Sequence, residues 1–208
     1  MTPISVFGPQ LNTVHPVTPV LITGPALEPV SLSEAKAWLR LDSTDEDAIV
    51  TALISAARLT VEAASRRVLM SQTWRLVMDY WPVGGILKVQ LSPFKAILAA
   101  RSFDIYGNVT NYDPTGFIVD KASEPARITA ANNIAPVTGR PFAGIELDVQ
   151  LGFGANATDV PQPLRQAILL LVALWFENRG DGIGGAGEPL PPAIKALIAP
   201  FKRPRIGG

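Results

Sequence analysis

The sequence predicts an α+β fold in which helices and strands occupy separate stretches of the chain. Two capping boxes, near residues 31 and 43, each precede an apolar pattern of helical period. From about residue 72 the pattern changes to alternation between apolar and polar residues, which is typical of strands with one buried face. Because the order is helices, strands and a final helix, a doubly wound parallel sheet is disfavoured.

Three helices are expected in the body of the chain. The first, 31–41, begins at the capping box SLSE, and the second, 45–67, begins at an acidic run that suits the positive end of a helix. The third, 161–179, begins at Pro-Gln-Pro and ends before Gly180, a favoured C-terminal cap. Because the third helix is apolar on nearly every side, we expect neighbouring subunits to cover part of it. The residues expected to make these ring contacts are Leu164, Ile168, Leu171 and Trp175.

The segment between the second and third helices is expected to form short antiparallel strands. Alternation is clear at 74–80 and again at 144–151. Between them, Gly107-Asn108 is a two-residue hairpin signal that would join strands at 97–106 and 109–112.

Composition divides the chain into an arm, a body and a tail. Residues 1–28 carry one charged residue and five prolines, but are too apolar for a typical solvated tail. We therefore expect an extended Pro-rich arm laid along a neighbouring subunit, with disorder as the alternative. Residues 29–180, including the β part at 72–151, form the globular body, and residues 181–208 form a Gly/Pro-rich tail.

The tail is expected to contain a short helix at 191–199. A short amphipathic helix on a Gly-rich tether suits docking into the groove of a partner. The basic residues of the tail suit an acidic protein surface, whereas four charges would give only weak affinity for nucleic acid. A solvated basic end is the alternative. The residues expected to bind a partner are Ile194, Leu197, Ile198, Phe201, Lys202, Arg203 and Arg205.

The residue types present predict no catalytic, cofactor or metal site. The chain has no cysteine and a single histidine, His15, which excludes thiol chemistry and His-rich metal sites. The acidic run 45–47 would point in different directions on a helix. The glycines of 182–187 match the G-x-G-x-x-G pattern, but they follow a helix rather than a strand, which favours a flexible hinge. We therefore expect a protein without cofactor and without enzymatic activity.

Charge and hydropathy also bear on the surroundings of the protein. With 18 basic and 18 acidic residues the formal net charge is zero, which disfavours a protein that coats nucleic acid. The longest apolar run, 167–176, has ten residues, fewer than the roughly 18 to 20 of a membrane span. The N-terminus lacks the basic and apolar regions of a signal peptide. No membrane partner is expected.

Several short stretches stand in a distinctive order and spacing over about residues 29–180: PVSLSEAK (29–36), LRLD (39–42), DED (45–47), LISAAR (53–58), SQTWRL (71–76), SPF (92–94), DIYGN (104–108), GFG (152–154), VP (160–161), QAILLLVA (166–173) and WFENR (175–179). Together they resemble the head–tail connector (adaptor) proteins of long-tailed phages and phage-like gene transfer particles.

The resemblance implies a mainly α-helical bundle with an inserted small antiparallel β-sheet, flanked by the arm and the tail. It implies a structural protein in the neck of a virion or phage-like particle, made in the bacterial cytoplasm. About twelve copies would form a ring under the portal and join head to tail around the DNA channel. The implied partners are the portal protein, neighbouring copies, a tail or neck stopper or terminator protein, and DNA that passes without sequence-specific binding. No catalytic residues belong to this family.

Two other hypotheses compete with a ring adaptor. A monomeric module could bind a peptide or carbohydrate through the β part, and it would keep that activity without 1–28 and 181–208. An enzyme with a non-obvious site would instead show a deep pocket lined by convergent polar groups.

Overall fold

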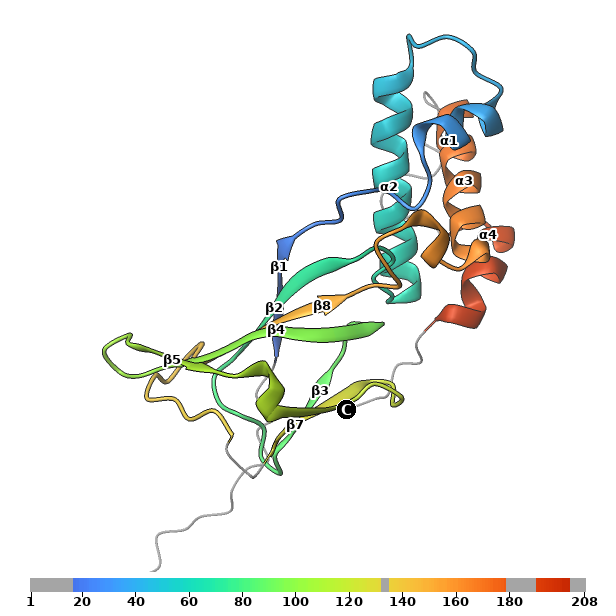
Figure 1. Cartoon of the computed structure of the whole chain (residues 1–208). Coiled ribbons are helices and arrows are strands. Elements are labelled where there is room, and N and C mark those ends of the chain that lie inside the picture. The colour runs from blue at the N-terminus through green and yellow to red at the C-terminus, as the bar shows by residue number, and fades with distance from the viewer. Residues whose placement is uncertain (1–16, 132–134, 179–189, 203–208) are drawn as a thin grey trace, which may run out of the picture.

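The computed structural model describes residues 17–131, 135–178 and 190–202, which form an elongated molecule with helices at one end and sheets at the other (Figure 1). The helices are α1 (Leu32–Leu39), α2 (Asp47–Ser65), α3 (Gln162–Glu177) and α4 (Pro192–Ile198). The strands are β1 (Thr18–Thr23), β2 (Gln72–Met78), β3 (Ile86–Val89), β4 (Phe94–Phe103), β5 (Val109–Tyr112), β6 (Phe117–Asp120), β7 (Ala126–Ala130) and β8 (Ile145–Leu151).

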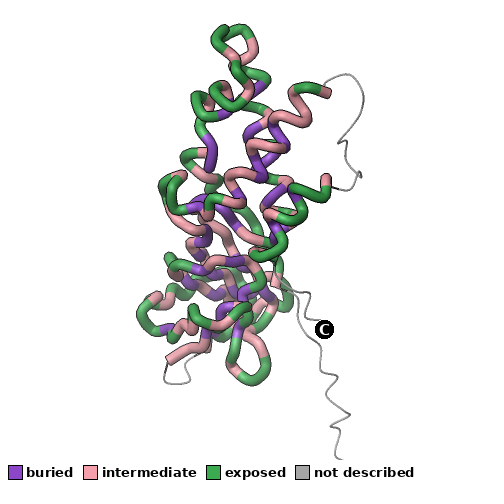
Figure 2. The backbone as a smooth tube through the Cα atoms, turned by 90° about the vertical axis from the view of Figure 1, so that its right-hand side faces the viewer, coloured by how far each residue is buried: buried purple, intermediate pink, exposed green. Residues whose placement is uncertain are grey.

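The prediction of a mainly helical bundle with a small inserted sheet is wrong. The structure is 35% helical and 30% strand, and its described part has 4 helices and two sheets of 5 and 3 strands. The segment from β2 to β8 encloses a hydrophobic core of its own, separate from that of the helices. Figure 2 shows buried residues at both ends of the molecule. The sheets are therefore a structural unit comparable in size with the helices.

The larger sheet has the strand order β1-β2-β8-β4-β5, and every neighbouring pair is antiparallel. The smaller sheet has the order β3-β7-β6. The core between them draws side chains from both sheets, including Leu76 and Leu147 of the larger sheet and Leu87 and Ile128 of the smaller one. The alternation predicted for the strands at 74–80 and 144–151 thus reflects one face buried in this core.

The hairpin between β4 and β5 has a longer loop than the predicted two residues. The strands end at Phe103 and resume at Val109, so the loop spans 104–108. The Asp104 carboxylate accepts hydrogen bonds from the backbone N–H groups of Tyr106 and Asn108, both at 2.8 Å. These bonds fold the loop around one side chain, as Asp commonly does in turns.

At the helical end, one of the two predicted capping boxes forms. The Ser31 hydroxyl accepts a hydrogen bond from the Glu34 N–H at 3.2 Å, and the Ser31 N–H donates to the Glu34 carboxylate at 3.0 Å. The box predicted at residue 43 does not form, because α2 begins at Asp47 and its N-cap, Glu46, makes no capping side-chain bond.

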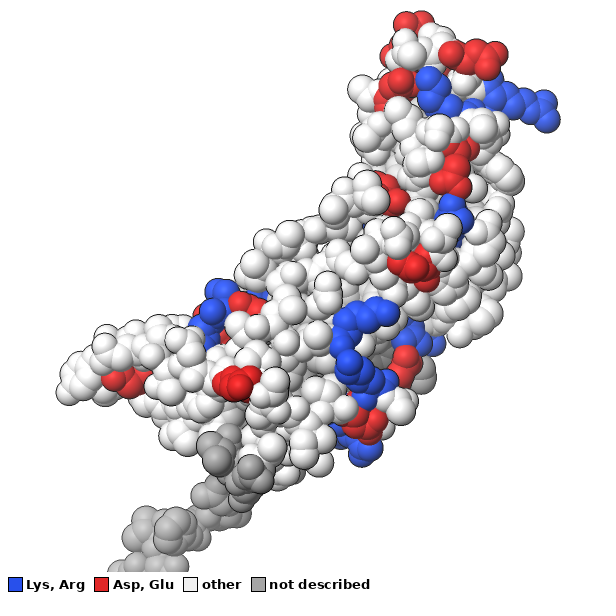
Figure 3. Space-filling model, in the orientation of Figure 1, with Lys and Arg blue, Asp and Glu red and all other residues white. Residues whose placement is uncertain are grey.

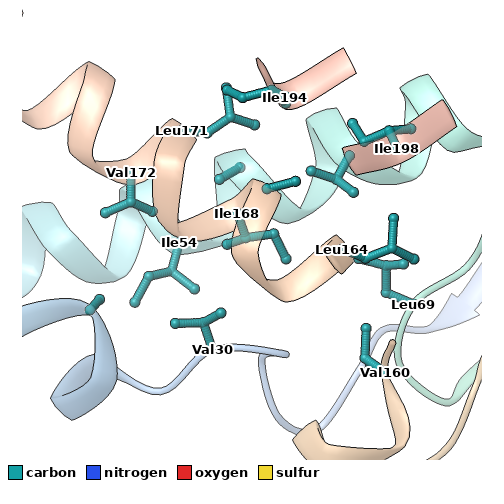
Figure 4. Packing of buried hydrophobic residues seen from close by; sticks show 14 of the residues in the cluster. Val30, Ile54, Leu69, Val160, Leu164, Ile168, Leu171, Val172, Ile194 and Ile198 are labelled. Atoms are coloured by element: carbon teal, nitrogen blue, oxygen red, sulfur yellow. The ribbon is translucent and has the colours of Figure 1, made fainter. Parts of the chain in front are cut away.

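The core of the helical end lies between α2, α3 and α4 (Figure 4). α2 contributes a buried stripe that includes Ile54, and α3 contributes Ile168 and Leu171. By length and composition α2 is also the one helix of the described residues that could cross a membrane, with a mean hydropathy of 1.4, although the sequence analysis expected no such segment. Helices in the core of a protein meet the same criteria of length and composition. α2 packs against α3 through the buried stripe on one of its faces.

Gly152, directly after β8, holds a conformation that other residues rarely adopt. Its φ is +114°, and a Cβ atom at this position would lie 2.2 Å from the Met70 carbonyl oxygen. We expect Gly152→Ala to lower the free energy of unfolding by about 1–3 kcal/mol, because backbone atoms cannot move aside cheaply. Urea denaturation followed by circular dichroism measures this. Gly24→Ala is the control, since no described atom lies within 4 Å of the added Cβ. Equal losses in the two variants would contradict the prediction.

Candidate assembly surface

The predicted ring-contact residues of α3 lie mainly in the interior of the chain. Leu164, Ile168 and Leu171 are buried, and Trp175 is half-buried against the same core. The first three side chains therefore offer no surface to a neighbouring subunit in this conformation. Ring contact through these residues stays a prediction, with Trp175 the one of the four that keeps exposed surface.

The four apolar residues among the predicted partner-binding residues also face the chain's own core. Ile194 and Ile198 are buried, and Leu197 and Phe201 pack against the same cluster. Lys202 is exposed, while Arg203 and Arg205 follow the last residue that the structure describes. Docking of the apolar face of α4 into a partner stays a prediction, and it would require α4 to leave α3.

Arg67 holds the last described turn of the C-terminal segment against the body. Its Nε donates to the Phe201 carbonyl oxygen at 2.9 Å, and its Nη1 donates to the Ser92 hydroxyl at 2.9 Å. The same guanidinium forms a two-pronged ion pair with Glu124, the arrangement that suits Arg and carboxylate groups best. One side chain thus links the region after α2, both sheets and the turn at Phe201.

The outer face of the larger sheet carries a network of four charged residues. Arg75 Nε donates to Asp148 at 2.7 Å, and Arg101 Nε donates to Glu146 at 2.9 Å. Arg75 also pairs with Glu146, and Arg101 with Asp148. Burial raises the pKa of the Asp148 carboxyl, but the hydrogen bonds and charges of the two guanidinium groups outweigh it and hold the pKa below its usual value. The two positive and two negative charges compensate one another on this face.

Surface charge elsewhere is sparse. In Figure 3, acidic and basic side chains both lie at the tip of the helical end, and a mainly basic group with acidic neighbours lies near its junction with the sheets. Of the acidic run at 45–47, Asp47 pairs with Lys36 at 2.6 Å and Asp45 accepts a hydrogen bond from Ser43 at 2.6 Å.

No site for metal chemistry is found in the described ranges. They hold no group of three or more His, Cys, Asp or Glu residues able to bind a metal ion. The most buried carboxylate with a shifted pKa, Glu62, accepts hydrogen bonds from the Leu69 N–H and from Arg58. Glu62 is therefore occupied by hydrogen bonds that hold α2 to the chain after it. His15 and the glycines of 182–187 lie beyond the residues that the structure describes.

Exposed apolar side chains gather at β1, whose apolar content the sequence indicated as part of the arm, and at the β4–β5 loop, which was not predicted as a contact surface. β1 presents Val20, Leu21 and Ile22, and the β4–β5 loop presents Ile105 and Tyr106. Residues 18–23 were predicted as part of the arm, but in the structure they pair with the chain's own β2. Their β-branched and apolar content was the signal that could have indicated a strand.

Comparison with known proteins gives likenesses to solved structures. No family model and no curated protein sequence matches the chain. A chain in the neck of an empty gene transfer agent (GTA) particle, computed with C6 symmetry, is 29% identical with a TM-score of 0.76, over 92% of this chain and 98% of that chain. A chain in the virion of a native GTA particle is 28% identical with a TM-score of 0.75, over 91% and 97%. A chain in the neck of a native GTA particle, computed with C12 symmetry, is 28% identical with a TM-score of 0.68, over 91% and 98%.

These likenesses cover both ends of the molecule, so they concern the whole described body. The similar chains are structural components of virions, and nothing in the comparisons points to an enzymatic activity. In fold and in sequence the chain resembles neck components of gene transfer agent particles, which supports a structural role and a location in the neck of a virion.

Proposed function

We propose that the chain is the head–tail adaptor of a tailed phage or phage-like particle. About twelve copies would form a ring that joins the portal to the next neck component, a stopper or terminator protein, around the DNA channel. The observation that carries this proposal is the likeness over 92% of this chain and 98% of a chain in a GTA neck. The C6 and C12 symmetries of those necks support a ring.

In this proposal the C-terminal tail from Lys202 onward contacts an acidic surface of the portal. Arg67 supports this role, since it fixes the chain at Phe201, one residue before the exposed Lys202. Arg203 and Arg205 add two further positive charges. Ile194, Leu197, Ile198 and Phe201 would join the contact if α4 moved away from α3.

The outer face of the larger sheet suits passage of DNA without binding. The network of Arg75, Arg101, Glu146 and Asp148 has no net charge, so it offers no excess of cations to neutralise phosphates.

A tagged chain expressed in producing cells tests the proposed location. We expect immunogold electron microscopy of purified particles to place the label between head and tail, and we expect cells that lack the chain to make heads without attached tails. Label elsewhere on the particle, or tailed particles made without the chain, would contradict the proposed function.

Portal binding is tested by pull-down with the portal protein of the same particle. The triple variant Lys202→Ala, Arg203→Ala, Arg205→Ala should lose binding. It removes the three positive charges that would face the acidic surface of the portal. The matched control removes three exposed lysines of the sheet end, Lys88, Lys95 and Lys121, and should bind normally. Equal binding by both variants would refute the role of the tail.

A further inference from the structure

The two edges of the larger sheet are open and carry no charged residue. β1 and β5 end the strand order, and no further strand pairs with either within the described ranges. Neither TPVLIT of β1 nor VTNY of β5 contains Lys, Arg, Asp or Glu. Edge strands are commonly protected against pairing by charge, proline, short length, bulges or a covering segment. Here β1 contains Pro19 and a register shift between Leu21 and Thr23, and β5 has only four residues, but no charged side chain guards either edge.

Both edges also expose apolar side chains. Val20, Leu21 and Ile22 are 43%, 48% and 46% exposed, and Val109 of β5 is 50% exposed. Consecutive half-exposed apolar residues on an open strand mark a surface that another strand can cover.

The directions of the strands make these edges complementary. Four antiparallel steps separate β1 from β5, so the two strands run in the same direction. A closed ring is built from one contact between two different surfaces of each subunit. Adding β1 of a second copy beside β5, in continuation of the sheet, gives a parallel strand pair and leaves the next β5 free for another copy. A two-fold contact between two β1 strands would be antiparallel and would stop at a dimer.

We infer that β1 of one copy pairs with β5 of the next copy, so that the sheet continues from subunit to subunit around the ring. This inference rests on the proposed ring and specifies the contact by which it closes. A standard interface buries about 800 Å² on each partner, more than two short strands supply. The strand pair therefore sets the register between copies, and neighbouring surfaces add to the buried area.

The pairing registers show which side chains share the core-facing side of the sheet. Leu21 lies opposite Trp74, which lies opposite Val149. Thr110 lies opposite Ser102, which lies opposite Ile145. Val149 and Ile145 are buried residues of the same face of β8, so Leu21 and Thr110 also share that face.

The opposite face carries the charged network. Val20 lies opposite Arg75, and Val109 lies opposite Phe103, which shares a face of β4 with Arg101. Successive side chains of a strand point to opposite faces, and partner residues on parallel strands advance together along both chains. In the register that places Leu21 beside Thr110 of the next copy, Val20 would therefore lie beside Val109, whereas crossed combinations would lie on different faces.

Introduced cysteines test this arrangement, because the chain has none of its own. Two same-face variants are Leu21→Cys/Thr110→Cys and Val20→Cys/Val109→Cys. Two crossed variants, Leu21→Cys/Val109→Cys and Val20→Cys/Thr110→Cys, place the two cysteines on different faces. A third control, Leu59→Cys/Thr110→Cys, pairs β5 with an exposed position on α2. Particles purified from producing cells are treated with a short bis-thiol reagent and analysed on denaturing gels.

We expect the same-face variants to give a ladder of dimers and higher multimers, at least about tenfold more than the crossed and α2 controls, because paired strands lie about 4.8 Å apart. Dimers from Leu21→Cys alone would show a two-fold β1 contact and overturn the inference. So would equal yields from same-face and crossed variants, or no ladder from particles whose necks contain the chain by electron microscopy. Necks without the chain would overturn the proposed function itself.

Discussion

Leu171→Ala is expected to lower the free energy of unfolding of the isolated chain by about 2–5 kcal/mol, the range for a large buried side chain replaced by alanine. Leu171 is 1% exposed and lies in the core formed by α2, α3 and α4. Its truncation removes apolar contacts and leaves a cavity that the surrounding helices fill only in part. Urea denaturation followed by circular dichroism measures the loss.

The matched control is Leu59→Ala, the same substitution on α2 at a side chain that is 57% exposed. We expect this variant to lose less than about 1 kcal/mol. If Leu171→Ala kept its stability but failed to assemble, Leu171 would be a ring contact, as the sequence analysis expected. Comparable losses in the two variants would contradict the burial difference between the two positions.

The burial of Leu171 shows which properties of α3 the sequence could reveal and which it could not. The proline-containing start, the apolar run and the glycine at 180 predicted the helix at 161–179, and α3 spans Gln162–Glu177. A helix that is apolar on most sides must be covered, but its sequence does not say by what. Neighbouring subunits were expected to cover part of it, and the structure shows that α4 and α2 of the same chain cover the side with Leu164, Ile168 and Leu171, so contact with another subunit stays a prediction. α4 follows a Gly-rich stretch, and its packing on α3 is a tertiary contact without a local signal.

The sheets were underestimated for a similar reason. The strands β3 and β6 of the smaller sheet have four residues each, too few for alternation to stand out, so their joint core with the larger sheet could not be read from the sequence. In β1 all six residues are exposed, and an edge strand without a buried face shows no period of two. Pro19 and its neighbouring prolines favoured an arm instead. Likewise, Arg67 contacts Phe201 across 134 positions of sequence, a pairing that only the fold creates.

Arg58→Ala is expected to lower the free energy of unfolding by about 3–5 kcal/mol at pH 7, because it leaves a buried carboxylate without its cation. Arg58 is 8% exposed, and its guanidinium donates to Glu28 at 2.7 Å and to Glu62 at 2.9 Å. Glu62 also accepts hydrogen bonds from the Leu69 N–H at 2.8 Å and from Gln72 at 3.0 Å. These contacts join α2 to the segment before α1 and to the start of β2.

The loss should depend on pH, and the pKa of Glu62 gives the sign. Burial raises this pKa above its usual 4.5, although the Leu69 N–H and Arg58 lower it in part. A carboxyl with a raised pKa in the folded state stabilises the fold fully below its usual pKa, and this contribution is lost as pH rises through the folded value. Without Arg58 the folded pKa of Glu62 rises further, so Arg58→Ala should be less destabilised at pH 4.5 than at pH 7, each relative to the unmodified chain.

In Arg58→Ala/Glu62→Gln the buried charge is absent while an acceptor for the Leu69 N–H remains, so the double variant should recover stability at pH 7 and lose this pH dependence. Denaturation curves at both pH values measure these differences, and an equal loss at pH 4.5 and pH 7 in Arg58→Ala would show that the buried charge of Glu62 is not its cause.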